Sequence, residues 1–404
     1  MRHMFTTDKR RRFLHRTQSL KLQHLRDAVQ QNQVTGYPPF VEEFERDFAR
    51  YVGCRHGVTF CNGTSTLEAA LFALGVGEGD EVLVPAYTFH ASIDPILNAG
   101  ARPVYLDIDR RTQTLDPSEI DRRRTPATRA ILVVHMMGNP APMDAIMARA
   151  TGLGVVEDCS HAHGATWGGR KVGSFGQVGC FSLQGSKPVS AGEGGIAVTD
   201  REDLWRRLNL FGHFGRGADG AAADPYAPLA KTGMGFKRRA NPLGLCMARV
   251  DLQFLDEVNA ALTELTGRLA EIVAPIPWLT PVASWPEARK GGFFYGMPVR
   301  IERDHPRAMT RDALLQALTA RGLEAKSYPY HAYHRMPHMV DGAVRRRLLY
   351  PGRPLAEPAA EPVPLPDLPH TDEAQAQTLF LSLEAFADDG WVKRWARGLP
   401  ECCG

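Results

Sequence analysis

Between about residues 80 and 200 the chain alternates short apolar runs with longer stretches of helical periodicity. The runs are rich in Val, Ile and Leu and predict strands at Glu81–Pro85, Arg102–Asp107, Ala130–His135, Gly154–Asp158, Gly179–Leu183 and Gly195–Thr199. Strands that are apolar along their whole length are typical of a mostly parallel sheet with helices on both faces. The pattern therefore predicts an α/β domain.

The pattern changes in the last third of the chain. A helix is predicted from Pro242 to about Leu269, and a strand, a helix and a strand follow at Phe293–Ile301, Thr310–Arg321 and Ala325–Pro329. The stretches Gly212–Arg239 and Pro351–Pro369 lack a sustained period and predict a loop and an extended segment. We expect a large domain with an N-terminal arm over residues 1–270 and a small α+β domain over residues 271–404.

Composition narrows the class of protein. Of the 404 residues, 44% are apolar and 23% charged, which is close to the average of globular proteins and excludes collagen-like or disordered chains. The charges nearly balance at +3, so we expect neither nucleic acid nor a membrane surface as a partner. The seven cysteines show no CxxC spacing, and the N-terminus lacks the apolar core of a secretion signal. These features favour a cytoplasmic enzyme without disulfides.

The first candidate site is the segment Asn62-Gly63-Thr64-Ser65, which precedes an apolar helix. The free N–H groups at a helix N-terminus attract anions, and Gly63 permits close approach of the backbone, so Gly63 and Thr64 predict a phosphate seat. The alternative is that Asn62, Thr64 or Ser65 serves only as an N-cap.

The second candidate is Asp158, at the end of a strand that also carries Glu157. Ligands of open α/β sheets bind beyond the carboxyl ends of the strands. A helix cap or a solvated strand end is the common fate of such a carboxylate. A cysteine and two histidines follow within five residues, but ligands so close together on an irregular loop rarely converge on one ion, so we expect no metal.

The third candidate is Lys187, on a loop that follows the strand ending near Ser182. Pro188 favours an extended backbone at this lysine, and a desolvated lysine can condense with a carbonyl as a Schiff base. A solvated surface lysine is the alternative. Together, a phosphate seat, an acid at a strand end and an amine are the three groups that pyridoxal phosphate requires.

These residues and their order resemble those of the DegT/DnrJ/EryC1/StrS family of pyridoxal-phosphate-dependent sugar aminotransferases. The resemblance is carried by Gly36–Glu45, Gly79–Phe89, Glu157-Asp158, Lys171–Gly176 and Gly192–Gly195, and it fades in the last third except near Tyr328–His331. It implies a fold-type I transferase with a mostly parallel seven-stranded sheet, and a homodimer whose sites are built from both chains.

The resemblance also implies roles for individual residues. Lys187 would bind the cofactor aldehyde and move protons, and Asp158 would pair with the ring nitrogen. The other contacts implied are Phe89 and His161 on the two ring faces and Gly63, Thr64 and Ser182 at the phosphate. Lys237 stands where many members have an asparagine that reaches the partner's phosphate. The implied substrate contacts are Tyr37, Arg239, Tyr330 and His331.

The reaction implied is transfer of an amino group from glutamate or glutamine to a nucleotide-linked keto-sugar or a keto-cyclitol, in antibiotic or surface-sugar biosynthesis. One alternative is a dehydratase or lyase of the same fold, but such members carry histidine in place of the lysine. A non-catalytic regulatory protein is another. An NAD-dependent reductase would need a GxGxxG turn after the first strand, and no such turn follows a predicted strand.

Overall fold

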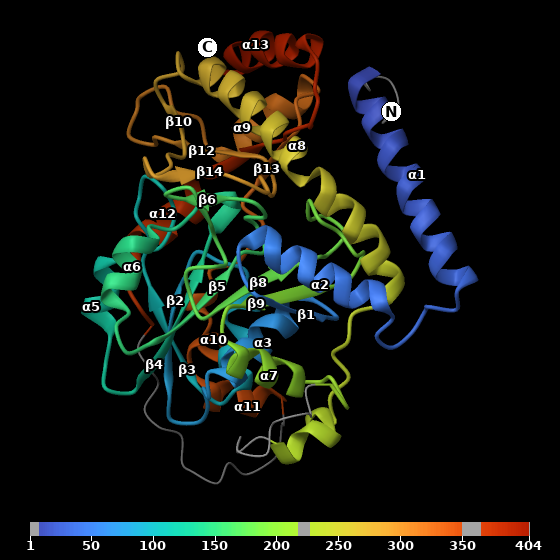
Figure 1. Cartoon of the computed structure of the whole chain (residues 1–404). Coiled ribbons are helices and arrows are strands. Elements are labelled where there is room, and N and C mark those ends of the chain that lie inside the picture. Colours follow the sequence, from blue (N-terminus) through green and yellow to red (C-terminus); the bar gives the residue numbers. More distant parts are fainter. Residues whose placement is uncertain (1–7, 217–226, 350–364, 404) are drawn as a thin grey trace.

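The computed structural model describes residues 8–216, 227–349 and 365–403 (Figure 1). Its centre is a seven-stranded sheet in the order β1-β9-β8-β5-β4-β2-β3. The strands are β1 (His56–Phe60), β2 (Glu81–Pro85), β3 (Arg102–Leu106), β4 (Thr128–Val134), β5 (Gly154–Asp158), β8 (Val178–Ser182) and β9 (Gly195–Thr199). Strands β3, β2, β4, β5 and β8 run parallel, whereas β9 is antiparallel to both β8 and β1. The predicted mostly parallel seven-stranded sheet is confirmed.

Six of these strands fall within two residues of their predicted bounds, and β1 was not predicted. The packing of β2 explains why the predicted strands are apolar along their length and do not alternate between apolar and polar residues. Val82 and Val84 pack in one core with helices α3 (Gly63–Ala73) and α4 (Asp94–Asn98), whereas Leu83 packs in a second core with α5 (Ser118–Arg123) and α6 (Met143–Arg149). Because successive side chains alternate between faces, a sheet covered on both faces needs an apolar residue at every position.

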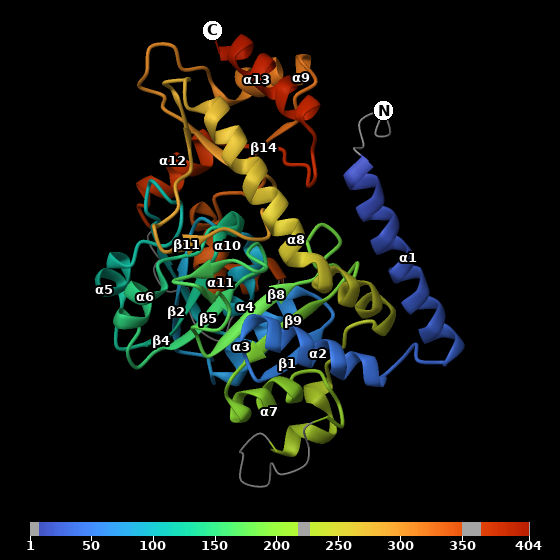
Figure 2. The same ribbon diagram turned by 45° about the horizontal axis from the view of Figure 1, so that its top comes forward.

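Two long helices flank the sheet. Helix α8 (Pro242–Val273) packs against α2 (Pro39–Val52) near its start and enters the core of a second sheet near its end (Figures 1 and 2). Helix α1 (Asp8–Gln30) lies beside α8. The N-terminal arm is thus largely helical. The predicted domain boundary at residue 270 falls in the last turn of α8, so the division of the chain there remains a prediction.

The second sheet has four strands in the order β10-β12-β14-β13. These are β10 (Leu279–Pro281), β12 (Met297–Ile301), β13 (Ala325–Ser327) and β14 (Thr378–Leu381), which pack with α9 (Arg311–Ala320) and α13 (Asp389–Cys403). The remaining elements are three short strands, β6 (Thr166–Trp167), β7 (Arg170–Lys171) and β11 (Ala288–Arg289), and the helices α7 (Glu202–Leu210), α10 (Pro337–Val340), α11 (Gly342–Leu349) and α12 (Pro369–Gln377).

Five 3-10 turns complete the described chain: η1 (His90–Ser92), η2 (Met136–Gly138), η3 (Ala227–Lys231), η4 (Gly233–Gly235) and η5 (Tyr333–Arg335). The predicted loop Gly212–Arg239 contains η3 and η4, and part of it lies outside the described residues, as does most of the predicted extended segment Pro351–Pro369. Across the described ranges, no helix is both long and apolar enough to cross a lipid bilayer.

Candidate active site

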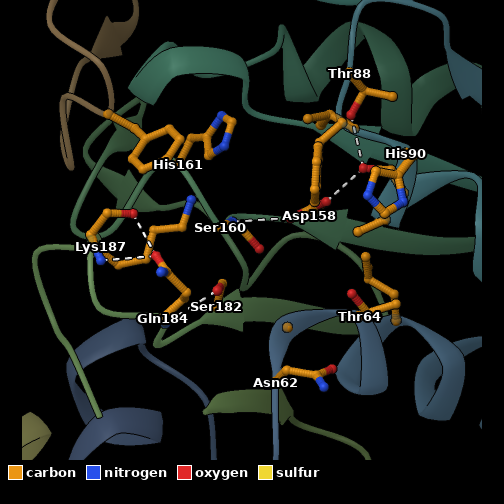
Figure 3. Close-up of a pocket in the computed structure, with 18 of the residues that line it drawn as sticks. Asn62, Thr64, Thr88, His90, Asp158, Ser160, His161, Ser182, Gln184 and Lys187 are labelled. Carbon is orange, nitrogen blue, oxygen red and sulfur yellow. Dashed lines mark hydrogen bonds between the residues drawn. The ribbon is translucent and has the colours of Figure 1, made fainter. Parts of the chain in front are cut away.

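A cavity of about 550 Å³ opens beyond the carboxyl ends of β2, β5 and β8 (Figure 3). It brings together the three candidates that the sequence singled out, the start of α3, Asp158 and Lys187. The predicted site residues that line it are Gly63, Thr64, Phe89, Asp158, His161, Ser182, Lys187 and Tyr330. These residues are up to 267 positions apart in the chain, from Gly63 to Tyr330. Seven of them lie at or beyond the carboxyl ends of strands of the large sheet, which share one edge, whereas Tyr330 follows β13 of the second sheet.

The start of α3 forms the floor of the cavity in Figure 3. The side chain of Asn62 caps the helix, since its Oδ1 accepts a hydrogen bond from the backbone N–H of Ser65 at 2.8 Å. A Cβ added at Gly63 would lie 2.8 Å from the Cβ of Ser182, closer than non-bonded carbon atoms approach. The glycine therefore lets the helix N-terminus reach the end of β8. The N-terminus of α3 can therefore be capped by Asn62 and still offer backbone N–H groups to an anion.

Asp158 lies at the last position of β5 and is 6% exposed. Its Oδ1 accepts a hydrogen bond from the backbone N–H of Ser160 at 3.0 Å, and its Oδ2 accepts one from the hydroxyl of Ser92 at 2.8 Å. Both oxygens accept, which is the pattern of an ionised carboxylate. The site thus holds a buried negative charge facing the cavity.

Lys187 lies five residues beyond the end of β8, and its amine faces the cavity in Figure 3. Burial lowers its pKa from 10.5 to about 7, and the negative charge of Asp158 opposes part of this shift. Its Nζ lies 3.3 Å from the centroid of the Phe294 ring. A lysine in this environment is largely neutral just above neutral pH, and a neutral amine is the nucleophilic form.

His161 and Phe89 supply flat surfaces to the cavity. The His161 ring stacks on Phe294 with centroids 4.3 Å apart and planes at 25°, and Tyr330 Oη lies 3.2 Å from its Nε2. Burial, followed by the nearby charge of Lys187, lowers the pKa of His161 well below its usual value, so the ring is neutral. Phe89 is 38% exposed and packs on Tyr330 at 5.0 Å.

Four predicted residues are not among those that line the cavity. Tyr37 Oη lies 2.9 Å from Nδ1 of His213, and Arg239 lies over the Tyr37 ring at 5.9 Å. Lys237 and His331 are exposed. Their roles toward phosphate or substrate remain predictions.

One neighbour of Lys237 has a contact that the sequence interpretation missed. Arg238 Nη1 donates a hydrogen bond to Ser65 Oγ at 3.1 Å, and its Nη2 pairs with Glu68 Oε2 at 2.9 Å. The sequence signal is the run of three basic residues from Lys237 to Arg239, which indicates that a positively charged side chain could lie near an anion-binding site. It does not show which of the three side chains turns toward α3.

The sequence interpretation also missed Phe294 and Tyr295, which line the cavity. They lie in a turn where a strand from Phe293 was predicted; the prediction is wrong there, since β12 begins at Met297. Phe293 and Tyr295 have positive φ angles of 42° and 68°, so the backbone cannot be extended. A Cβ at Gly292 would lie 2.5 Å from the carbonyl oxygen of His161. The pair Gly291-Gly292 before the aromatic residues was the available signal.

Behind the cavity, the buried Glu157 carboxylate accepts four hydrogen bonds. Three come from the backbone N–H groups of Gly173, Phe175 and Gly176 at 2.6–2.7 Å, and the fourth comes from Nε2 of His135 at 3.0 Å. The Nδ1 of His135 accepts from Ala141 N, so Nε2 carries the proton. Glu157, His135 and Cys159 offer atoms within 4.8 Å of one another. The occupied carboxylate lone pairs give Glu157 a structural role.

The model of the DegT/DnrJ/EryC1/StrS aminotransferase family matches residues 16–381. The chain belongs to this family. The resemblance inferred from the motifs is confirmed, and it extends into the last third, to residue 381, where the motifs had faded. Members of the family are aminotransferases, and so is this chain.

Individual relatives agree with the family assignment. Over 235 residues the chain is 43% identical to an L-glutamine:2-deoxy-scyllo-inosose aminotransferase of Streptoalloteichus tenebrarius; the match covers 57% of this chain and 54% of that protein. It is 34% identical over 300 residues to GDP-perosamine synthase of Caulobacter vibrioides, covering 74% of this chain and 78% of that protein. The crystal structure of S. venezuelae DesV in complex with a ketimine intermediate has a TM-score of 0.80 and 28% identity, covering 97% and 96% of the two chains.

Proposed function

We propose that this aminotransferase uses pyridoxal phosphate to move an amino group from glutamine or glutamate to a keto-cyclitol or a nucleotide-linked keto-sugar. One observation carries the proposal: a single cavity contains the start of α3, the buried carboxylate of Asp158 and the half-buried amine of Lys187. A phosphorylated pyridine aldehyde needs an anion seat, an acid and an amine, and few other ligands need all three.

The described residues fit this cofactor. The close approach of Gly63 to Ser182 leaves the backbone of the α3 N-terminus open to a phosphate. The Nδ1 of His161 is buried without a hydrogen-bond partner in the described part of the chain, as expected of a ring whose role is to stack. The phosphate would be held by Gly63, Thr64 and Ser182, the ring by Phe89, His161 and Asp158, and the aldehyde by Lys187.

When bound, pyridoxal phosphate supplies an electron-accepting ring that stabilises negative charge on the carbon beside the substrate nitrogen. The protein's own part is acid–base chemistry. Burial lowers the pKa of Lys187 to about 7, so about half of the amine is neutral at pH 7, and in this form it could take a proton from that carbon and later return it. With its negative charge, Asp158 would keep the ring nitrogen of the bound cofactor in its protonated form. Phe294, stacked on His161, covers one side of the amine and limits access of water.

The substrate classes are supported by the relatives. One uses L-glutamine with 2-deoxy-scyllo-inosose, a cyclitol ketone by name, and another is a GDP-perosamine synthase. The presence of Lys187 favours amino transfer over the dehydratase alternative, whose members carry histidine there. We also propose a homodimer, in which the exposed Lys237 would reach the phosphate of the partner's site and Tyr37, Arg239, Tyr330 and His331 would surround the substrates.

A substrate panel tests this function. Purified protein loaded with pyridoxal phosphate is incubated with glutamine or glutamate and with a set of keto-cyclitols and nucleotide-linked keto-sugars, and amine products are identified by mass spectrometry. We expect one donor to convert the cofactor stoichiometrically to its amine form, and one acceptor class to return it. Protein that binds no pyridoxal phosphate, or holds it without reacting with either donor, would contradict the proposal.

A further inference from the structure

Two buried hydroxyl groups, those of Ser92 and Thr88, lie beside Asp158 in the lining of the cavity. Ser92 is 0% exposed and Thr88 is 1% exposed. The oxygen atoms of the two side chains are 2.8 Å apart, and Ser92 Oγ lies 2.8 Å from Asp158 Oδ2. In Figure 3, dashed lines link the labelled Thr88 and Asp158 at the wall of the cavity.

The direction of these hydrogen bonds follows from the chemistry of the groups. The Asp158 carboxylate accepts at both oxygens, so the Ser92 hydroxyl donates its only proton to Oδ2. The hydrogen bond between the two hydroxyls must then be donated by Thr88 to Ser92 Oγ. Each donor polarises the next in such a chain, which strengthens the final bond to the charged carboxylate.

The local fold explains how one short turn supplies both hydroxyls. After β2, η1 (His90–Ser92) brings Ser92 back toward Thr88, four residues earlier, and the Ser92 N–H bonds to the Phe89 carbonyl at 3.0 Å. Phe89 lies between the two and faces the cavity. The same turn therefore presents an aromatic face to the cavity and hydroxyl groups to the acid.

We propose that Ser92, supported by Thr88, is a positioning residue that holds the charged Asp158 carboxylate in the orientation in which it meets the cofactor ring nitrogen. The inference rests on the proposed cofactor. With Ser160 N–H on Oδ1 and Ser92 on Oδ2, rotation of the carboxylate would break both bonds. The remaining lone pairs are left for the group that occupies the cavity.

The test uses the pyridoxal-phosphate-loaded protein with Ser92→Ala, Ser92→Thr and Thr88→Val. The readouts are the single-turnover rate with glutamine or glutamate, the donor concentration for half-maximal rate, and the nitrogen NMR signal of isotope-labelled cofactor, which reports ring protonation. Ser92→Ala should slow the reaction about 10- to 100-fold, as expected for losing a hydrogen bond to a charged group, with the half-maximal donor concentration unchanged. The nitrogen signal should move toward that of the unprotonated ring.

Two comparisons separate positioning from folding. Ser92→Thr keeps the hydroxyl and should restore the wild-type nitrogen signal, whereas Thr88→Val should give a smaller change than Ser92→Ala. The matched control is Ser382→Ala, which removes a buried hydroxyl that lacks a partner among the described residues and lies outside the cavity. In an Asp158→Asn background, Ser92→Ala should cause no further loss of rate, because the two residues act through one group.

The outcomes distinguish the two proposals. Wild-type protein that binds no pyridoxal phosphate contradicts the proposed function itself. Wild-type protein that transaminates normally, with a Ser92→Ala variant of equal rate and identical nitrogen signal, overturns the role of Ser92 alone. Loss of thermal stability in Ser92→Ala without any change in the nitrogen signal would also overturn it, since this is the result of a merely structural hydrogen bond.

Discussion

Glu157 and Asp158 are consecutive at the end of β5, yet their carboxylates serve different sides of the sheet. Asp158 faces the cavity, whereas Glu157 accepts hydrogen bonds from His135 and from three backbone N–H groups of the segment Gly173–Gly176. Successive side chains of a strand point in opposite directions, so one strand end supplies both the candidate acid of the cavity and a carboxylate that binds the neighbouring segments.

Glu157→Gln is expected to lower stability. The amide retains one acceptor oxygen but places an NH₂ group against backbone donors, which leaves buried N–H groups unpaired. We expect a loss of about 2 to 5 kcal/mol in the free energy of unfolding. Chemical denaturation measures this, with the exposed Glu78→Gln as control. Equal stability of the two variants would show that the Glu157 contacts contribute little.

Lys187→Ala should reduce transamination by about 1,000-fold or more, because it removes both the nucleophile and the proton carrier. In wild-type protein, borohydride should attach pyridoxal phosphate permanently to Lys187, as located by peptide mass spectrometry. Lys290→Met is the matched control. Lys290 is a second lysine whose pKa burial lowers, to about 8, but it lies outside the cavity and donates to Val282 O at 3.1 Å. If borohydride attached pyridoxal phosphate to Lys290 instead, the proposal that Lys187 binds the cofactor aldehyde would be wrong.

Lys187 also predicts how stability depends on pH in the cofactor-free protein. The pKa of Lys187 is about 7 in the folded protein, and its ordinary value, which applies to the unfolded chain, is 10.5. Between pH 7 and pH 10.5 the unfolded chain therefore binds more protons than the folded protein. Stability from this group therefore rises as the pH increases from 7 to 10.5 and is lowest below 7. In thermal unfolding curves, Lys187→Met should stabilise the protein most at and below pH 7, with the advantage shrinking as the pH rises toward 10.5. A constant difference would mean that the amine is not desolvated.

Asp158→Asn should slow the amino-donor half-reaction about 100- to 1,000-fold, because a neutral amide no longer stabilises positive charge on the ring nitrogen. Cofactor affinity should change much less, since the phosphate contacts are intact. Stopped-flow absorbance and equilibrium titration separate the two effects. Asp144→Asn, on the exposed surface of α6, controls for the loss of a charge. A half-reaction at the wild-type rate would assign Asp158 to structure.

Gly63→Ala should weaken cofactor binding, because its Cβ would lie 2.8 Å from the Cβ of Ser182 and would push the start of α3 away from β8. We expect at least a 10-fold loss of affinity from this displacement, a free energy of about 1.4 kcal/mol. Gly77→Ala is the control, since an added Cβ there meets nothing within 4 Å. Titration of the two apoproteins with pyridoxal phosphate measures the difference, and equal affinities would show that the helix N-terminus is not the phosphate seat.

Much of the large sheet was predictable because its strands are short, apolar runs with clear ends. Asp158 and Lys187 became candidates because their surroundings, a strand end and a loop of small residues, are local features of the sequence. Strand β1 (His56–Phe60) was missed, since its sequence HGVTF holds too few apolar residues to stand out. It becomes a strand by pairing with β9, from Gly195 onward, and that pairing is a long-range contact.

The sequence alone indicated the family, six of the seven strands of the large sheet and the candidate amine and acid, because each is marked by short patterns of consecutive residues. Only the tertiary structure decided which side chains surround them. Phe294 approaches Lys187 from a turn with left-handed residues, and Ser92 contacts Asp158 from the 3-10 turn η1 that follows β2. Such contacts depend on backbone angles and on strand order in the sheet, and local periodicity contains no information about either.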